Sequence, residues 1–482
     1  MTPLPLAPDL AAAVAAQRFG LGEPGLESIG SDARGWLLSQ IDAADAQRGR
    51  ALPAAADGLR AHAEFVRLQR QQRSPTEPGM AGPRSSEQQF GDHFRPLVQA
   101  DLQARLLTAA TTRRPFVERI ALFWANHFTV SQAKASLRGL VGAFEREAIR
   151  PHIAGPFQTV LKAAVTHPAM LRYLDNDNSA GPTSPLVRRL ARLPRPEGAP
   201  GPRITGLNEN LARELLELHT LGAASGGAGY GGWGGYTQSD VGALARLLTG
   251  WRVVAQPPAG TDLPGTRFDP LWHEPGEKSV LGKAYPEGAG ALDQVLHDLT
   301  RHPSTARFVA AKLARHFVAD TPPPALVARL AATFTATEGD LASVYRELVL
   351  APESWDPAPT KFKTPEEFVV SSLRLIGIGE SALERPTDLG IGNLGQRVQA
   401  APSPAGWPDR AEDWLGPDAV WKRVEWATRL ADGQGRRVDA RALARLGLGA
   451  RLGAATAREI DRAADGPQAL ALLLLAPEHQ RR

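Results

Sequence analysis

Apolar residues recur at helical spacing along most of this chain, whereas alternating runs of β-branched residues are scarce. A period of three to four residues places apolar side chains on one face of a helix, while a strand needs a period of two. The 482 residues include 47 glycines and 40 prolines, which interrupt helices and favour long loops. The sequence therefore predicts a mainly α fold: a large multi-helix body with long Gly/Pro-rich loops and at most a few short strands.

The order of helical blocks and loops predicts three segments. We expect an N-terminal helical segment over 1–73, a main helical domain with a polar cleft over 85–382, and a Pro/Trp-rich loop with C-terminal helices over 383–482, packed on the main domain. The segment from Trp251 to Tyr285 is the best place for short strands, because its β-prone pieces stand between turns.

Charge and composition exclude several classes of protein. Lys and Arg number 55 against 51 Asp and Glu, and no dense basic run is interleaved with aromatics, so no nucleic-acid partner is expected. The absence of cysteine excludes disulfides and thiolate chemistry. No window approaches 18 uninterrupted apolar residues, so we expect a soluble chain without membrane insertion. The N-terminus has no signal-peptide pattern, which predicts a cytoplasmic location; periplasmic or extracellular location by co-export with a partner is the alternative.

Known cofactor motifs are missing. Gly20 to Gly25 matches the dinucleotide-binding pattern, but an Ala-rich helix precedes it where a strand is required. The Gly-rich stretch after Gly222 lacks the Gly-Lys-Ser/Thr of a phosphate-binding loop, and no His-Glu-x-x-His zinc helix occurs. A nucleotide cofactor is therefore not expected, whereas a divalent metal remains open.

The stretch from Asn208 to Gly222 carries the most heavily charged polar face. At about 100° per residue, one side of this helix collects polar side chains: Glu209, Asn210, Arg213, Glu214 and Glu217. Carboxylates held together in a cleft acquire separated pKa values and divide acid and base roles. Alternatively, residues spaced i, i+4 and i+8 form a solvated salt-bridge ladder, as Glu209, Arg213 and Glu217 are placed to do.

Two histidines outside this helix are further candidates. His127 lies on the apolar face of a helix expected over 116–128, which is typical of a core histidine, although Asn126 beside it could project with it into a pocket floor. His273 and Lys278 lie in one turn, where loop positions often carry chemistry; a solvated polar turn is the alternative. Trp251 is a candidate for stacking on a substrate.

Several phrases of the chain, in order, match a known family. They include Gln17–Gly20, Trp124–Phe128, His167–Met170, Asn208–Gly222, Leu248–Trp251, His302–Phe308, Lys361–Pro365 and Gly406–Pro408. On these phrases the chain resembles bacterial proteins of domain of unknown function 1800 over nearly its whole length. The resemblance implies a predominantly helical fold and no established reaction. It also implies a sulfatase-like partner of domain of unknown function 1501, which is often encoded beside such proteins.

The residues favour a hydrolase or lyase-like enzyme acting on a polar substrate such as a carbohydrate. Glu217, Glu214 or Glu209 would act as general acid or base, and Arg213 would clamp an anionic group. His127 and His273 would carry protons or bind a metal, with Asn126, Asn210, Lys278 and Trp251 holding the substrate. The competing hypothesis is a non-catalytic accessory protein that docks with the sulfatase-like partner through the loops at 226–236 and 401–414.

Overall fold

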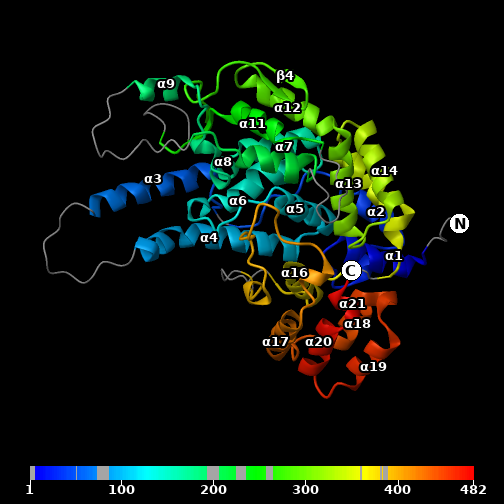
Figure 1. Ribbon diagram of the computed structural model, residues 1–482. Coiled ribbons are helices and arrows are strands. Elements are labelled where there is room, and N and C mark those ends of the chain that lie inside the picture. Colours follow the sequence, from blue (N-terminus) through cyan, green and yellow to red (C-terminus); the bar gives the residue numbers. More distant parts are fainter. Residues whose placement is uncertain are drawn as a thin grey trace, which may run out of the picture.

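The computed structural model describes residues 6–49, 51–72, 86–192, 206–223, 235–256, 264–358, 361–379, 383 and 389–482. Helices dominate this part of the chain (Figure 1), and the prediction of a mainly α fold is confirmed. The α-helices are α1 Pro8–Val14, α2 Ala33–Leu38, α3 Ala55–Gln72, α4 Ser86–Thr111, α5 Pro115–His127, α6 Val141–Phe144, α7 Phe157–Thr166, α8 Pro168–Tyr173, α9 Pro185–Ala191, α10 Asn210–Glu214, α11 Gln238–Leu248, α12 Gly290–Arg301, α13 Pro303–Phe317, α14 Pro324–Ala336, α15 Leu341–Leu350, α16 Pro365–Leu375, α17 Pro417–Gln434, α18 Ala440–Leu448, α19 Ala454–Arg462, α20 Gly466–Leu475 and α21 Pro477–Gln480.

All strands of the described part lie in the segment where strands are expected. They are β1 Trp251–Val254, β2 Gly265–Phe268, β3 Lys278–Val280 and β4 Lys283–Tyr285. β1 pairs antiparallel with β2, with Trp251 opposite Phe268, and β3 pairs antiparallel with β4, with Lys278 opposite Tyr285. Each pair is too short to be stable in isolation, so both depend on the helices packed around them.

Two helices, α8 and α13, each begin at a His-Pro dipeptide. At α8 and α13, the ring Nδ1 of His167 and of His302 accepts the backbone N–H of the residue two positions on, at 3.1 Å each. Proline then occupies the first helical position, where its missing N–H costs nothing. This dipeptide separates α13 from α12, which ends at Arg301.

The polar helix expected over 208–222 has an irregular end. A regular helix, α10, gives way to a π-helical turn, η7 Leu215–Thr220, in which the Thr220 hydroxyl donates to the Leu215 carbonyl at 2.6 Å. A π-turn widens the helix and shifts its angular phase. Glu217 therefore does not continue the face of Glu209 and Arg213 as a uniform period of 3.6 predicts.

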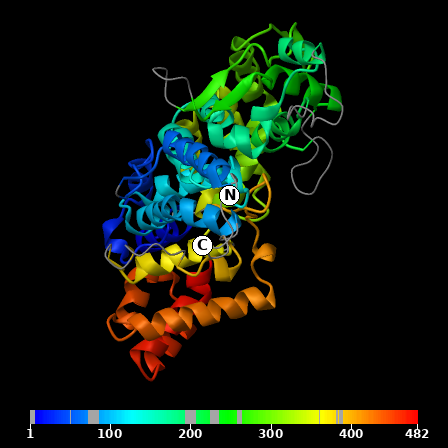
Figure 2. The same cartoon turned by 90° about the vertical axis from the view of Figure 1, so that its left-hand side faces the viewer.

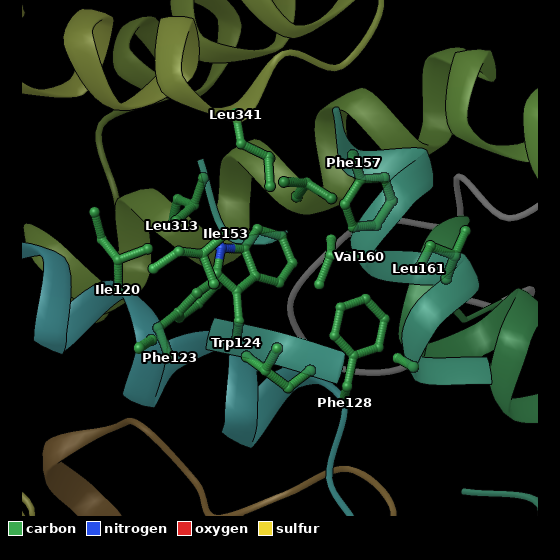
Figure 3. Packing of buried hydrophobic residues seen from close by; sticks show 14 of the residues in the cluster. Ile120, Phe123, Trp124, Phe128, Ile153, Phe157, Val160, Leu161, Leu313 and Leu341 are labelled. Carbon is green, nitrogen blue, oxygen red and sulfur yellow. The ribbon is translucent and has the colours of Figure 1, made fainter. Parts of the chain in front are cut away.

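The buried apolar residues form two clusters. The larger contains α5 and its neighbours; Figure 3 shows Trp124 and Phe128 packed against Phe157. The Trp124 Nε1 donates to the Tyr345 hydroxyl at 2.6 Å, which in turn donates to the Ile153 carbonyl at 2.7 Å, so this polar chain is satisfied within the core. The second cluster joins part of α4 to α16–α20.

The C-terminal helices and the strand region lie far apart in the molecule. The C-terminal helices α17–α20 lie at one end of the molecule, and the strands with α11 and α12 lie toward the opposite end (Figures 1 and 2). The division into 1–73, 85–382 and 383–482 stays a prediction. Within the described ranges, no helix combines the length and apolarity needed to cross a bilayer.

Candidate functional site

A cavity of about 440 Å³ lies where several separate parts of the chain meet. Its wall includes aromatic and charged side chains from α5, η7, α13, the start of α16 and the loop at 396–413: Phe123, Asn126, His127, Glu217, Leu218, Phe308, Lys312, Arg315, His316, Glu366, Glu367, Trp407, Asp409 and Asp413. Pockets that combine an apolar wall with a few convergent polar groups are the usual place for ligands. This cavity is the candidate site.

Three of the ten predicted site residues line the cavity: Asn126, His127 and Glu217. Asn126 holds the loop at 396–413 in place, because its amide donates to the Trp407 carbonyl at 2.9 Å and accepts the Trp407 N–H at 2.8 Å. Gly406 has φ +83°, and a Cβ there would lie 2.5 Å from the Asn126 carbonyl oxygen. Glycine at position 406 is thus required for this wall.

His127 is buried in the wall of the cavity. Its Nε2 donates to the His219 carbonyl at 3.2 Å, while its Nδ1 has no partner among the described residues. Burial, with the charge of Lys312 as the second cause, holds the pKa of His127 well below its ordinary value. The ring is therefore neutral at physiological pH and presents one unsatisfied acceptor.

The glutamates of the polar helix separate into two environments. Glu209 and Arg213 form a half-exposed pair at 3.3 Å, bridged by Gln238, which donates to Glu209 at 2.7 Å. Glu217 instead lines the cavity and has no ion pair among the described residues. Glu214 lies between Arg213 and Glu217 in the sequence. Burial, followed by the charge of Glu217, raises the pKa of Glu214. The ladder interpretation fits Glu209 and Arg213, and the cleft interpretation fits Glu217.

The turn at 273–278 lies outside the cavity wall. His273 and Lys278 do converge, with Lys278 Nζ 3.0 Å from His273 Nε2. The His273 Nδ1 donates to the Thr249 carbonyl at 2.8 Å, and the Gly288 N–H also reaches Nε2, at 3.2 Å. These bonds tie the strand region together and leave the imidazole no free position. Trp251 packs edge-on against Phe268. Trp251 and Asn210 also lie outside the cavity wall.

Sequence reasoning did not select the wall residues that α13 contributes. Phe308, Lys312 and His316 are spaced i, i+4 and i+8, so they occupy one face of this helix. His316 Nδ1 lies 3.0 Å from a carboxylate oxygen of Asp409, while its Nε2 has no partner in the described part of the chain. The signal was present, because Phe308 ends one family phrase and Asp409 follows another.

Burial and neighbouring charges shift several pKa values in the wall. Burial lowers the pKa of Lys312 to about 8 and also lowers the pKa of His316, against the opposing charge of Asp409. Burial alone would raise the pKa of Asp409, but the charges of His316 and Lys361 hold it below its ordinary value. Strongly shifted groups gathered in one cavity are typical of a functional site.

A buried ion network supports this side of the cavity. Glu367 pairs with Arg119 and with Arg482, the latter at 3.0 Å, and Arg482 also lies 3.6 Å from Asp409. Lys361 lies 3.2 Å from the same Asp409 carboxylate. Asp409 is therefore fixed by several cations, and it fixes the ring of His316 in turn.

No metal-binding group is formed by the residues that the structure places: no three His, Asp or Glu side chains among them are arranged around a common point. The residues predicted for proton transfer or metal binding, His127 and His273, lie in different parts of the fold. Among the residues that the structure describes, neither ring faces a second and third ligand of the required type. The described residues of the cavity wall thus include groups that can exchange protons, but they do not form a set of metal ligands.

Comparison with known proteins yields one match. The family model described as "Protein of unknown function (DUF1800)" matches residues 14–481. No curated protein and no solved structure matches the chain. The family phrases that surround Asn126, His127, Glu217 and Phe308 all lie within the matched range.

Proposed function

The chain belongs to the family described as protein of unknown function (DUF1800), whose description names no reaction. From this premise we propose a function based on the cavity itself. The protein is an enzyme, hydrolase or lyase-like, that performs acid–base chemistry on a small polar substrate. One observation carries the proposal: a single cavity wall contains the His316–Asp409 pair together with Glu217 and Lys312.

The roles of these residues follow from their surroundings. The Asp409 carboxylate orients the His316 ring, so Nε2 is the atom left to exchange a proton, as in a His–Asp pair. Glu217 is the second acid–base group, since no described cation neutralises it. The ammonium of Lys312 stabilises negative charge that develops on the substrate, and it does so strongly where water is excluded. Trp407 offers a ring on which a sugar could stack.

A comparison of two glutamates on the same helix tests the proposal. Thermal unfolding is measured with a panel of neutral sugars, sugar acids and glycosides, for the wild type, Glu217→Gln and Glu209→Gln. We expect Glu217→Gln to change stability by less than about 1 kcal/mol, but to remove the rise in Tm that a panel ligand gives the wild type. Glu209→Gln, in the exposed pair, should retain that rise.

Turnover then separates an enzyme from a binding protein. Ligands that raise Tm are assayed for conversion, and His316→Gln should abolish it, since glutamine cannot exchange a proton at neutral pH. Equal responses of the two glutamate variants, or a wild type that no panel ligand stabilises, would count against the cavity as the site.

A docking function is the second candidate, and one observation favours it. At the start of α17, Trp421 is 62% exposed and Val420 is 41% exposed, and Leu415 beside them is also exposed. Clustered exposed apolar side chains mark interaction surfaces. The loop at 401–414 instead lines the cavity with Trp407 and Asp409, and all of the loop at 226–236 except 235 and 236 lies outside the described residues.

Co-purification tests this candidate. The chain is co-expressed with the sulfatase-like protein that family members are expected to have as a neighbour, and complex formation is measured by size-exclusion chromatography. A docking role through α17 predicts a complex that Trp421→Ser weakens about tenfold or more, as expected for a tryptophan at the centre of an interface. Absence of a complex with the wild type would remove the candidate.

A further inference from the structure

Lys312 differs from every other lysine in the chain. The sequence contains eight lysines, and all of them are described. Four lie within salt-bridge distance of an aspartate, at 2.6 to 2.7 Å: Lys134, Lys162, Lys283 and Lys422. Their ammonium groups are neutralised at the protein surface or close to it.

The remaining three partnered lysines are buried and hydrogen-bonded. Lys361 pairs with Asp320 at 2.5 Å, Lys363 donates to Gln17 and Ser371 at 3.0 Å each, and Lys278 contacts His273. Lys312 has no carboxylate or hydrogen-bond acceptor among the described residues. Its Nζ lies 5.5 Å from the centroid of the Phe308 ring. This amine is therefore both unpartnered and part of a cavity wall.

The surroundings of Lys312 raise the share of its neutral amine above that of an ordinary lysine, because burial lowers its pKa to about 8. Asp409 is the acid whose charge acts on it, but Asp409 is already bound to His316 and Lys361. A lysine desolvated beside aromatic rings and left without a counter-ion loses its proton more readily than one in water. The neutral amine is a nucleophile, and lysines in such pockets attack carbonyl carbons.

We propose that Lys312 forms an imine with a small aldehyde or ketone bound in the cavity. This inference rests on the proposed acid–base function and names its substrate class. The Nζ lone pair attacks the carbonyl carbon, and the C=O π electrons move to oxygen, which takes a proton. Nζ gives up one proton as the carbinolamine forms. The hydroxyl then takes a proton and leaves as water, the nitrogen lone pair forms the C=N bond, and the nitrogen loses its second proton, so both amine hydrogens are accounted for by the water. His316, one turn further along α13, supplies and removes the protons.

Reductive trapping tests the inference on the wild-type protein. The chain is incubated with an equimolar aldehyde, glyoxylate in one arm and glyceraldehyde in the other, and the imine is reduced with cyanoborohydride. Peptide mass mapping is expected to find one adduct per chain, on Lys312, in at least one arm. A preference for glyoxylate would show that the carbonyl substrate carries an acid group.

Matched variants identify the reacting amine. Lys312→Arg keeps the positive charge but cannot form an imine, so it should fold normally and lose the adduct completely. Lys422→Arg removes an exposed lysine and should leave the Lys312 adduct unchanged. Adducts spread over Lys162, Lys283 and Lys422 with none on Lys312, or an adduct that survives in Lys312→Arg, would overturn the inference.

Failure of this inference can be told apart from failure of the proposed function. If no adduct forms on Lys312 but Glu217→Gln still removes the ligand-induced rise in Tm, the cavity binds a ligand and Lys312 acts only through its charge. If the trap fails and no ligand distinguishes Glu217→Gln from Glu209→Gln, both proposals are wrong. An adduct on Lys312 supports both.

Discussion

Replacing Glu367 by glutamine is expected to lower the free energy of unfolding by about 3 to 5 kcal/mol. The Glu367 side chain is buried between the guanidinium groups of Arg119 and Arg482. Although burial alone would raise the pKa of Glu367, these two arginines hold it far below its ordinary value, so the group is ionised in the folded state. Glutamine preserves the shape but leaves buried Arg119 without its ion-pair partner and buried Arg482 with only the more distant Asp409, at 3.6 Å.

Urea unfolding at neutral pH measures this effect. Asp418→Asn is the matched control, because Asp418 pairs with Lys422 at 2.6 Å with its side chain 79% exposed. Loss of that exposed pair should change stability by less than about 1 kcal/mol. If Glu367→Gln were no more destabilising than Asp418→Asn, the network would not support the wall of the cavity.

Acidification below pH 6.5 is expected to destabilise the protein steeply, before most carboxylates are protonated. Burial lowers the pKa of His219 from 6.5 to about 3 and holds the pKa values of His127 and His479 well below the ordinary value. Below pH 6.5 the unfolded chain therefore binds protons that the folded chain does not. Stability is fully present above 6.5 and falls with pH, by about 1.4 kcal/mol per pH unit for each such histidine.

The slope of stability against pH isolates the contribution of one ring. Free energies of unfolding are measured in urea from pH 7 to pH 5 for the wild type and His219→Gln. At the acid end of this range the variant should lose about 1.4 kcal/mol per pH unit of the slope, whatever its stability at pH 7. An unchanged slope would mean that His219 is protonated in the folded protein.

Much of the secondary structure was determined by local sequence. The helical period, the prolines that open α5, α8 and α13, and the β-prone pieces between 251 and 285 act over a few residues, so a short window contains their cause. The same holds for the Glu209–Arg213 pair, since residues four apart on a helix are neighbours in any tertiary fold. The sequence by itself also established the family, through phrases spread over nearly its whole length.

Tertiary structure alone decided which polar residues share a cavity. Glu217 separates from Glu209 because a π-turn follows α10, and that turn packs against α13 rather than following the local period. Lys312, His316 and Asp409 come together because α13 and the loop held by Asn126 meet in the fold, and no local pattern encodes that meeting. A buried lysine such as Lys361 is neutralised by a carboxylate distant in the chain, Asp320, so packing decided that Lys312 has no such partner among the described residues.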